Sequence, residues 1–216
     1  MGRQEIFDRV RVALRDVTET DPAKDTPIPW EYGRPTAVDD PIGLFVDRVI
    51  DYKATVEKAA DAQEISALVA RFLAEAHAES CVVPPGLDPK WYSAAAAAGV
   101  LIRPDDPPLS KQELDQTQAV ITAASVGMAQ TGTIALDHRS DQGRRVISLL
   151  PDTHICVIRS DQIVTDAPEA LARLKSSIRE GQPLTWISGP SATSDIELDR
   201  VEGVHGPRNL YVIILD

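Results

Sequence analysis

The chain contains 216 residues and carries 22 Lys and Arg against 33 Asp and Glu, which gives a formal net charge of −11. This length fits one large domain or two small ones, and we favour one, because a compact chain this long buries enough surface to fold without disulfides or structural metals. The acidic balance argues against a nucleic-acid-binding protein, since phosphate contacts need clustered cations.

The hydropathy pattern gives no sign of a membrane protein. The longest apolar stretch, Leu210 to Leu215, is far shorter than the ~18 residues of a membrane helix. The first residues are charged and amphipathic and lack the apolar core of a secretory signal. We therefore expect a cytoplasmic protein that binds no membrane.

The sequence offers no ligand set for a common cofactor. Cys81 and Cys156, its two cysteines, each lie in an apolar run, whereas an iron–sulfur cluster usually takes four thiolates. The glycine-rich fingerprints of dinucleotide and nucleotide-phosphate binding are missing, and so is the HExxH zinc motif. We expect two buried, reduced thiols and no cofactor bound by this chain.

The N-terminal part is predicted to form one helix and a linker. The helix covers residues 3–17, and residues 18–39 are rich in proline with little periodicity. We therefore divide the chain into residues 1–39, a helix with an extended linker, and residues 40–216, one α/β domain. The helix prediction depends on an apolar stripe with three- or four-residue spacing, formed by Ile6, Val10, Leu14 and Val17.

Strands and helices alternate over the next eighty residues, which predicts an open, mostly parallel sheet with helices on both faces. Asp40 and Asp61 are good N-caps for two of the helices. The predicted helices begin at residues 40 and 61 or cover 91–98 and 111–117, and the predicted strands are 54–59, 81–83, 100–102 and 119–123.

The last third of the chain is richer in strands. The apolar runs predict strands over 133–136, 154–158, 184–188 and 209–215, with one helix over 168–179. The residues with chemical potential crowd into this part, in three segments.

The first segment, residues 127–133, is predicted to be a loop between two strands. Ligands usually bind where a parallel strand ends. Gly132 permits a close backbone approach, Thr131 and Thr133 supply hydroxyls, and backbone N–H groups can cradle an anion. A ligand loop is our interpretation, and a tight structural turn is the alternative.

The second segment contains Arg144, Arg145 and His154. Paired guanidinium groups match a carboxylate or phosphate bidentately, and an imidazole at the start of a strand can be an acid, a base or a metal ligand. We predict that Arg145 and His154 contact an anionic ligand. The alternatives are a surface ion pair for the arginine and a hydrogen-bonded structural role for the histidine.

The third segment, SGPSATSDIE at 188–197, is the strongest candidate, because a strand runs into a Gly-Pro turn and then into hydroxyls. Ser188, Gly189 and Ser191 are predicted to bind an anion. We expect Thr131, Ser188 and Ser191 to lie within about one small ligand of each other.

Carboxylates and a histidine follow this turn. Asp195 and Glu197 are two residues apart, so they can face one side of an extended segment. With His205 they can bind a divalent cation or transfer a proton. We predict these three as catalytic residues and predict no metal site; helix capping beside a histidine-containing turn is the structural alternative.

Four segments together resemble the LUD-domain family, and within it the branch concerned with lactate utilization. The resemblance covers nearly the whole chain and implies a fold like that of ribose-phosphate isomerases and CoA transferases. The segments are AQTGT at 129–133, SLLPDTHICVI at 148–158, SGPSATSDIE at 188–197 and GVHGPRNLYVIIL at 203–215.

The resemblance implies that the chain takes part in oxidising L-lactate to pyruvate, with two partner proteins that carry iron–sulfur clusters. Whether this chain is itself a catalytic subunit stays open. Gln130 departs from the family, which often has Glu there, and an amide cannot act as a base or nucleophile. The alternatives are a free-standing isomerase-like or acyl-transferase-like enzyme acting on a small anion, and a non-catalytic ligand-binding or regulatory subunit.

Overall fold

The structure is a computed structural model that describes residues 2–19, 21, 24, 27, 33–190, 192–193, 201–202 and 206–216. It divides into two compact units, Met1–Arg34 and Pro35–Asp216. In the first unit, helix α1 (Arg3–Ala13) ends before the predicted residue 17 and has no buried residue. The last predicted turn, residues 14–17, is therefore not part of the helix.

A six-stranded sheet forms the centre of the second unit, and all neighbouring strands in it are parallel. The predicted open, mostly parallel α/β sheet is therefore confirmed. Its central strands are buried almost throughout, as expected where both faces of a parallel sheet are covered. The order is β1 (Thr55–Ala59), β12 (Asn209–Leu215), β7 (Thr153–Arg159), β4 (Ala119–Ala123), β2 (Ser80–Val83) and β3 (Leu101–Pro104).

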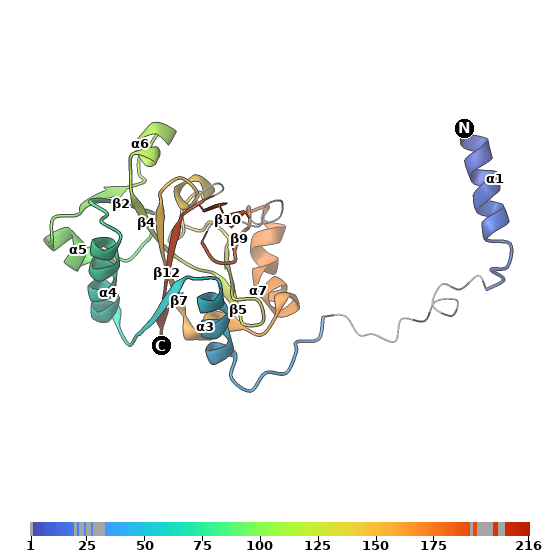
Figure 1. Cartoon of the computed structure of the whole chain (residues 1–216), viewed down its shortest axis with the longest axis horizontal. Coiled ribbons are helices and arrows are strands. Elements are labelled where there is room, and N and C mark those ends of the chain that lie inside the picture. The colour runs from blue at the N-terminus through green and yellow to red at the C-terminus, as the bar shows by residue number, and fades with distance from the viewer. Residues whose placement is uncertain are drawn as a thin grey trace. The chain divides into compact units, whose positions relative to one another are not determined.

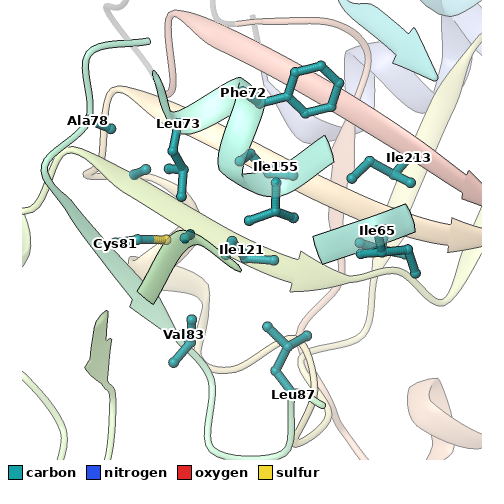
Figure 2. Packing of buried hydrophobic residues seen from close by; sticks show 14 of the residues in the cluster. Ile65, Phe72, Leu73, Ala78, Cys81, Val83, Leu87, Ile121, Ile155 and Ile213 are labelled. Atoms are coloured by element: carbon teal, nitrogen blue, oxygen red, sulfur yellow. The ribbon is translucent and has the colours of Figure 1, made fainter. Parts of the chain in front are cut away.

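Helix α4 (Ala62–Glu75) covers one face of this sheet (Figure 1). The Asp61 carboxylate begins the helix by accepting hydrogen bonds from the backbone N–H groups of Gln63 and Glu64, at 2.8 and 2.9 Å. Short helical segments η1 (Pro89–Tyr92), α5 (Ser93–Ala97) and α6 (Lys111–Asp115) follow. None of the helices in the described ranges is both long and apolar enough to cross a membrane. The apolar stripe of α4 packs on the strands, as Figure 2 shows for Ile65, Phe72, Leu73, Ile121, Ile155 and Ile213.

A second sheet of four strands packs against the other face of the first. Alternate residues of β7 divide between the two sides: Ile155 packs with α4, and Cys156 packs with the second sheet. Helix α3 (Pro41–Asp51) contributes Phe45 to this second core, and α7 (Ala167–Arg179) packs on the second sheet through Leu174. The order is β8 (Ile163–Val164), β5 (Val126–Met128), β6 (Thr133–Leu136) and β9 (Thr185–Ile187).

The second sheet is the main difference from the sequence prediction. Residues 127–133 do not form a loop throughout, because they begin in β5 and turn back into the antiparallel β6. Gly127 lies in β5. The strand has a glycine there because a Cβ would come within 2.8 Å of Ile158 Cδ1. A glycine that serves close packing gives a strand the composition of a loop. The other predicted strands and the helix over 168–179 are confirmed within two residues at either end.

Candidate functional site

A cavity of about 240 Å³ lies beside the amino ends of β7 and β12. This placement differs from the usual one at the carboxyl ends of parallel strands. No side chain in its described lining is charged. The lining comes from the turn η2 (Arg145–Ser148), the strands β7, β9 and β12, and two Gly-Pro turns, through Ser148, Leu149, His154, Thr185, Trp186, Ile187, Ser188, Gly189, Pro190, Gly206, Pro207 and Leu210.

His154 is the most deeply buried polar side chain of the described cavity wall, with 1 % of its surface exposed. Its Nε2 lies 2.8 Å from Thr122 Oγ1 on the neighbouring strand β4. Nδ1 has no hydrogen-bond partner among the described residues. Burial lowers the pKa of His154 to about 4, so the ring is neutral at physiological pH.

Replacing His154 by Gln is expected to weaken the dependence of stability on pH in mild acid. The native ring titrates near 4 and an unfolded histidine near 6.5. Between these values the unfolded chain binds a proton that the native chain does not, so stability falls as the pH falls. For the wild type this costs roughly 2 kcal/mol between pH 7.5 and pH 5.

Urea unfolding at the two pH values measures this difference, which should be smaller by that amount in His154→Gln. His77→Asn is the control, because it removes an exposed histidine at a positive φ that Asn tolerates. An unchanged pH dependence in His154→Gln would contradict a buried neutral ring.

Three hydroxyl groups link the β5–β6 turn to the cavity. Thr131 Oγ1 donates to Thr133 Oγ1 over 2.8 Å, and Thr133 Oγ1 lies 2.8 Å from Ser188 Oγ. Ser188 lines the cavity, whereas Thr131 and Thr133 do not. The structure therefore brings three of the predicted residues into one chain of hydroxyls that reaches the cavity through Ser188.

The predicted glycines allow close approach to helix α3. A Cβ on Gly132 would lie 2.7 Å from the carbonyl carbon of Arg48, and a Cβ on Gly189 would lie 2.5 Å from Tyr52 Cβ. Both glycines also have positive φ angles, of +58° and +81°. The end of α3 therefore supports both turns, and this packing explains Gly132 without a ligand; Gly189 also lines the cavity.

The adjacent arginines have different surroundings. Arg144 binds Asp105 through two hydrogen bonds, Nε to Oδ2 at 2.6 Å and Nη2 to Oδ1 at 2.7 Å. The carboxylate that this guanidinium holds is therefore one of the chain's own. Arg145 is exposed at the start of η2, has no ion pair among the described residues, and is not part of the cavity lining. Ser148 of the same turn lines the cavity and donates to the Arg145 carbonyl oxygen at 3.0 Å.

The predicted catalytic residues His205, Asp195 and Glu197, and the predicted anion-binding Ser191, lie outside the described residues. The described chain on either side of them lines the cavity, through Pro190 before this segment and Gly206 after it. Within the described part of the chain, His, Cys, Asp and Glu side chains form no group of three that could hold a metal ion.

Both cysteines are buried, as predicted. Burial raises the pKa of the Cys156 thiol to about 12 and raises that of Cys81 further. Thiolates are the form that binds metals and reacts, so neither side chain is available for such chemistry in the folded chain.

A separate polar cluster surrounds Asp137, which follows β6 and is buried. Burial by itself raises the pKa of this carboxyl, but hydrogen bonds from Ser125, Ser177 and Arg139 outweigh it and hold the pKa below its usual range. The Ser125 and Ser177 hydroxyls each donate to it at 2.5 Å. Because Ser177 belongs to α7, the cluster fastens that helix to the second sheet.

Sequence reasoning did not identify Thr122 or the cavity-lining Ser148, Thr185 and Leu210. Thr122 is the one of these that the sequence could have indicated, because it is the polar residue in the otherwise apolar strand β4. A buried polar side chain needs a partner, and that partner is His154. The others are recognisable only once the strands are assembled.

Comparisons with known proteins agree over most of the chain. The LUD domain family profile matches residues 42–215. Lactate utilization protein C of Deinococcus radiodurans is 46% identical over 187 residues, which cover 87% of this chain and 85% of that protein. Lactate utilization protein C of Bacillus licheniformis is 36% identical over 110 residues, or 49% of this chain and 45% of that one. The crystal structure of a DUF162 family protein from Deinococcus radiodurans superposes with a TM-score of 0.70 at 42% identity, covering 84% of this chain and all of that one.

Proposed function

The chain belongs to the LUD-domain family, and on that basis we propose that it serves lactate utilization, as a component of a cytoplasmic system that oxidises L-lactate to pyruvate. The observation that carries the proposal is the 46% identity to a lactate utilization protein C over 87% of this chain.

The proposal assigns electron transfer to other proteins. Oxidation of lactate to pyruvate releases two electrons and two protons, so an acceptor is required. The two cysteines of this chain are too few for an iron–sulfur cluster, and both are buried. We place the clusters on two partner proteins, with none on this chain.

The proposed ligand of this chain is a small carboxylate bound in the cavity. Ser188 and the two Gly-Pro turns supply polar groups there, and His154 forms part of the wall. Arg145 begins the turn η2, whose Ser148 lines the cavity, and it has no ion pair among the described residues. His205 directly precedes Gly206 of the lining, and we propose it as the base that takes a proton from the substrate, oriented by Asp195 or Glu197.

Deleting the gene is expected to abolish growth on L-lactate as sole carbon source and to leave growth on pyruvate unchanged. The wild-type gene should restore growth, and His205→Asn should not, although the variant protein accumulates to the same level. Lactate should remain in the medium of the deletion strain.

Consumption of L-lactate at the wild-type rate after deletion would contradict the proposal. Turnover of a small anion by the purified chain alone would favour the free-standing enzyme instead. Restored growth with His205→Asn would remove the catalytic role of that residue but keep the role of the chain.

A further inference from the structure

The polar groups of the cavity wall differ in the hydrogen-bonding capacity that they have left. The Thr185 hydroxyl is bonded to His138 Nε2 at 2.7 Å, and the Ser148 hydroxyl donates to the Arg145 carbonyl. Their hydrogens are therefore used within the protein. Ser188, His154 and the half-exposed Trp186, through its indole N–H, are the described side chains of the wall with capacity to spare, and His154 is the buried one among them.

Ser188 has a hydroxyl hydrogen available for a ligand. Thr131 donates to Thr133, and Thr133 lies 2.8 Å from Ser188 Oγ. Thr133 Oγ1 also lies 3.4 Å from the Thr131 carbonyl oxygen, but its 2.8 Å contact with Ser188 is the shorter of the two. When Thr133 donates to Ser188, the hydrogen of Ser188 is left for the cavity. Ser188 then presents a donor, which suits a carboxylate or carbonyl oxygen.

His154 presents the opposite capacity. Its Nε2 lies 2.8 Å from Thr122 Oγ1, the Thr122 hydroxyl donates to Cys156 Sγ at 3.9 Å, and the Cys156 thiol donates to the Ala123 carbonyl at 4.0 Å. Because the Thr122 hydrogen is directed at Cys156, we assign the hydrogen of the His154–Thr122 bond to Nε2. In this arrangement each hydrogen has an acceptor, whereas the other tautomer would leave a buried N–H without one. Orphaned buried N–H groups are rarer than unpaired acceptors, so Nδ1 is left as an acceptor without a partner among the described residues, on a side chain that lines the cavity.

We propose that His154 Nδ1 accepts a hydrogen bond from the hydroxyl of a small 2-hydroxy acid, so that the cavity distinguishes a hydroxy acid from the corresponding keto acid. This inference rests on the proposed function and names the group that selects the ligand at that site. A hydroxy acid offers a donor to His154 and an acceptor to Ser188, whereas a keto acid offers acceptors alone. Sites built to bond a substrate hydroxyl reject an analogue that lacks it, because a buried polar atom stays unpaired.

The size and charge of the cavity agree with such a ligand. A volume of about 240 Å³ equals about eight water-sized groups at about 30 Å³ each, which is enough for a three-carbon acid. The described lining contains no charged side chain, and an imidazole acceptor suits the hydroxyl of the ligand and not its carboxylate.

Calorimetric titration of the full chain with sodium L-lactate and with sodium pyruvate tests the proposal, because the two probes share a carboxylate and a methyl group. The wild type should bind L-lactate about tenfold more tightly than pyruvate, which corresponds to about 1.4 kcal/mol. His154→Gln keeps a donor to Thr122 but removes the acceptor at the δ position, and it should lose this preference. His154→Asn places an acceptor near the δ position and should retain most of it.

Nitrogen-15 NMR of the wild-type imidazole gives a readout that needs no variant to fold. Nδ1 should resonate as an unprotonated nitrogen and should shift when L-lactate is added, with little shift for pyruvate. A protonated Nδ1, equal affinities in the wild type, or an undiminished preference in His154→Gln would each overturn the inference while the growth test of the proposed function stands. Absence of binding by both probes would overturn the inference and also the proposed ligand, but not the role in lactate utilization.

Discussion

Gly132→Ala is expected to lower the free energy of unfolding by about 3 kcal/mol. The residue has a φ of +58°, where an L side chain is strained. Its new Cβ would also lie 2.7 Å from the carbonyl carbon of Arg48, 2.8 Å from Arg48 Cβ and 2.9 Å from the backbone nitrogen of Val49. Because two of these atoms belong to the helix backbone, α3 has to move away from the turn.

Gly181→Ala is the matched control, because Gly181 has a φ of +73° and a Cβ added to it would meet no atom within 4 Å. It should cost about 1 kcal/mol, from backbone strain alone. Urea unfolding followed by circular dichroism compares the two. Equal losses in both variants would show that contact with α3 is not what requires a glycine at 132.

Arg144→Ala is expected to destabilise the fold by about 3 kcal/mol, near the lower end of the range for breaking a buried ion pair because the arginine is itself partly exposed. The Asp105 side chain is 3% exposed and that of Arg144 is 40% exposed. Asp105 also accepts from the Leu109 backbone N–H at 2.9 Å. Without the guanidinium, its charge is left in a site that is nearly closed to water.

Arg145→Ala is the control for this prediction, since it removes the same side chain one position further along the exposed turn. It should change the unfolding free energy by less than about 0.5 kcal/mol. Urea unfolding of Arg144→Ala, of Asp105→Asn and of their double variant measures the coupling between the two groups, with Arg145→Ala measured beside them. Similar losses for both arginines, or no coupling to Asp105, would contradict this explanation.

Local signals in the sequence were sufficient for most of the first sheet and its helices. Ser110 and Glu113 have the spacing of a capping box, and they form one at the start of α6. The Ser110 N–H donates to the Glu113 carboxylate at 2.8 Å, and the Glu113 N–H donates to Ser110 Oγ at 3.2 Å. The apolar run Ala119–Ala123 became a buried central strand. Caps and apolar runs depend on residues close in the sequence, so they can be recognised without the fold.

The second sheet and the surroundings of the candidate site depend on distant residues. β8 has two residues and β5 has three, which is too short for a periodicity to show. Arg144 and Arg145 are adjacent residues of the same type, so the sequence does not distinguish their roles. The difference is that Arg144 binds Asp105, which lies 39 positions earlier. The partner of His154 is likewise 32 positions away. Such pairings are decided when the strands assemble, and a one-dimensional pattern does not contain them.

The position of β12 has a consequence for synthesis on the ribosome. This strand lies between β1 and β7, although it is made after both of them. At 5–20 residues per second, about 150 residues and roughly 8 to 30 s separate β1 from the strand that pairs with it. During that interval β1 has no neighbour in the sheet, and the apolar edge of β7 is open to other nascent chains. Chaperone binding to the nascent chain is therefore most needed after β7 emerges and should cease once β12 is released.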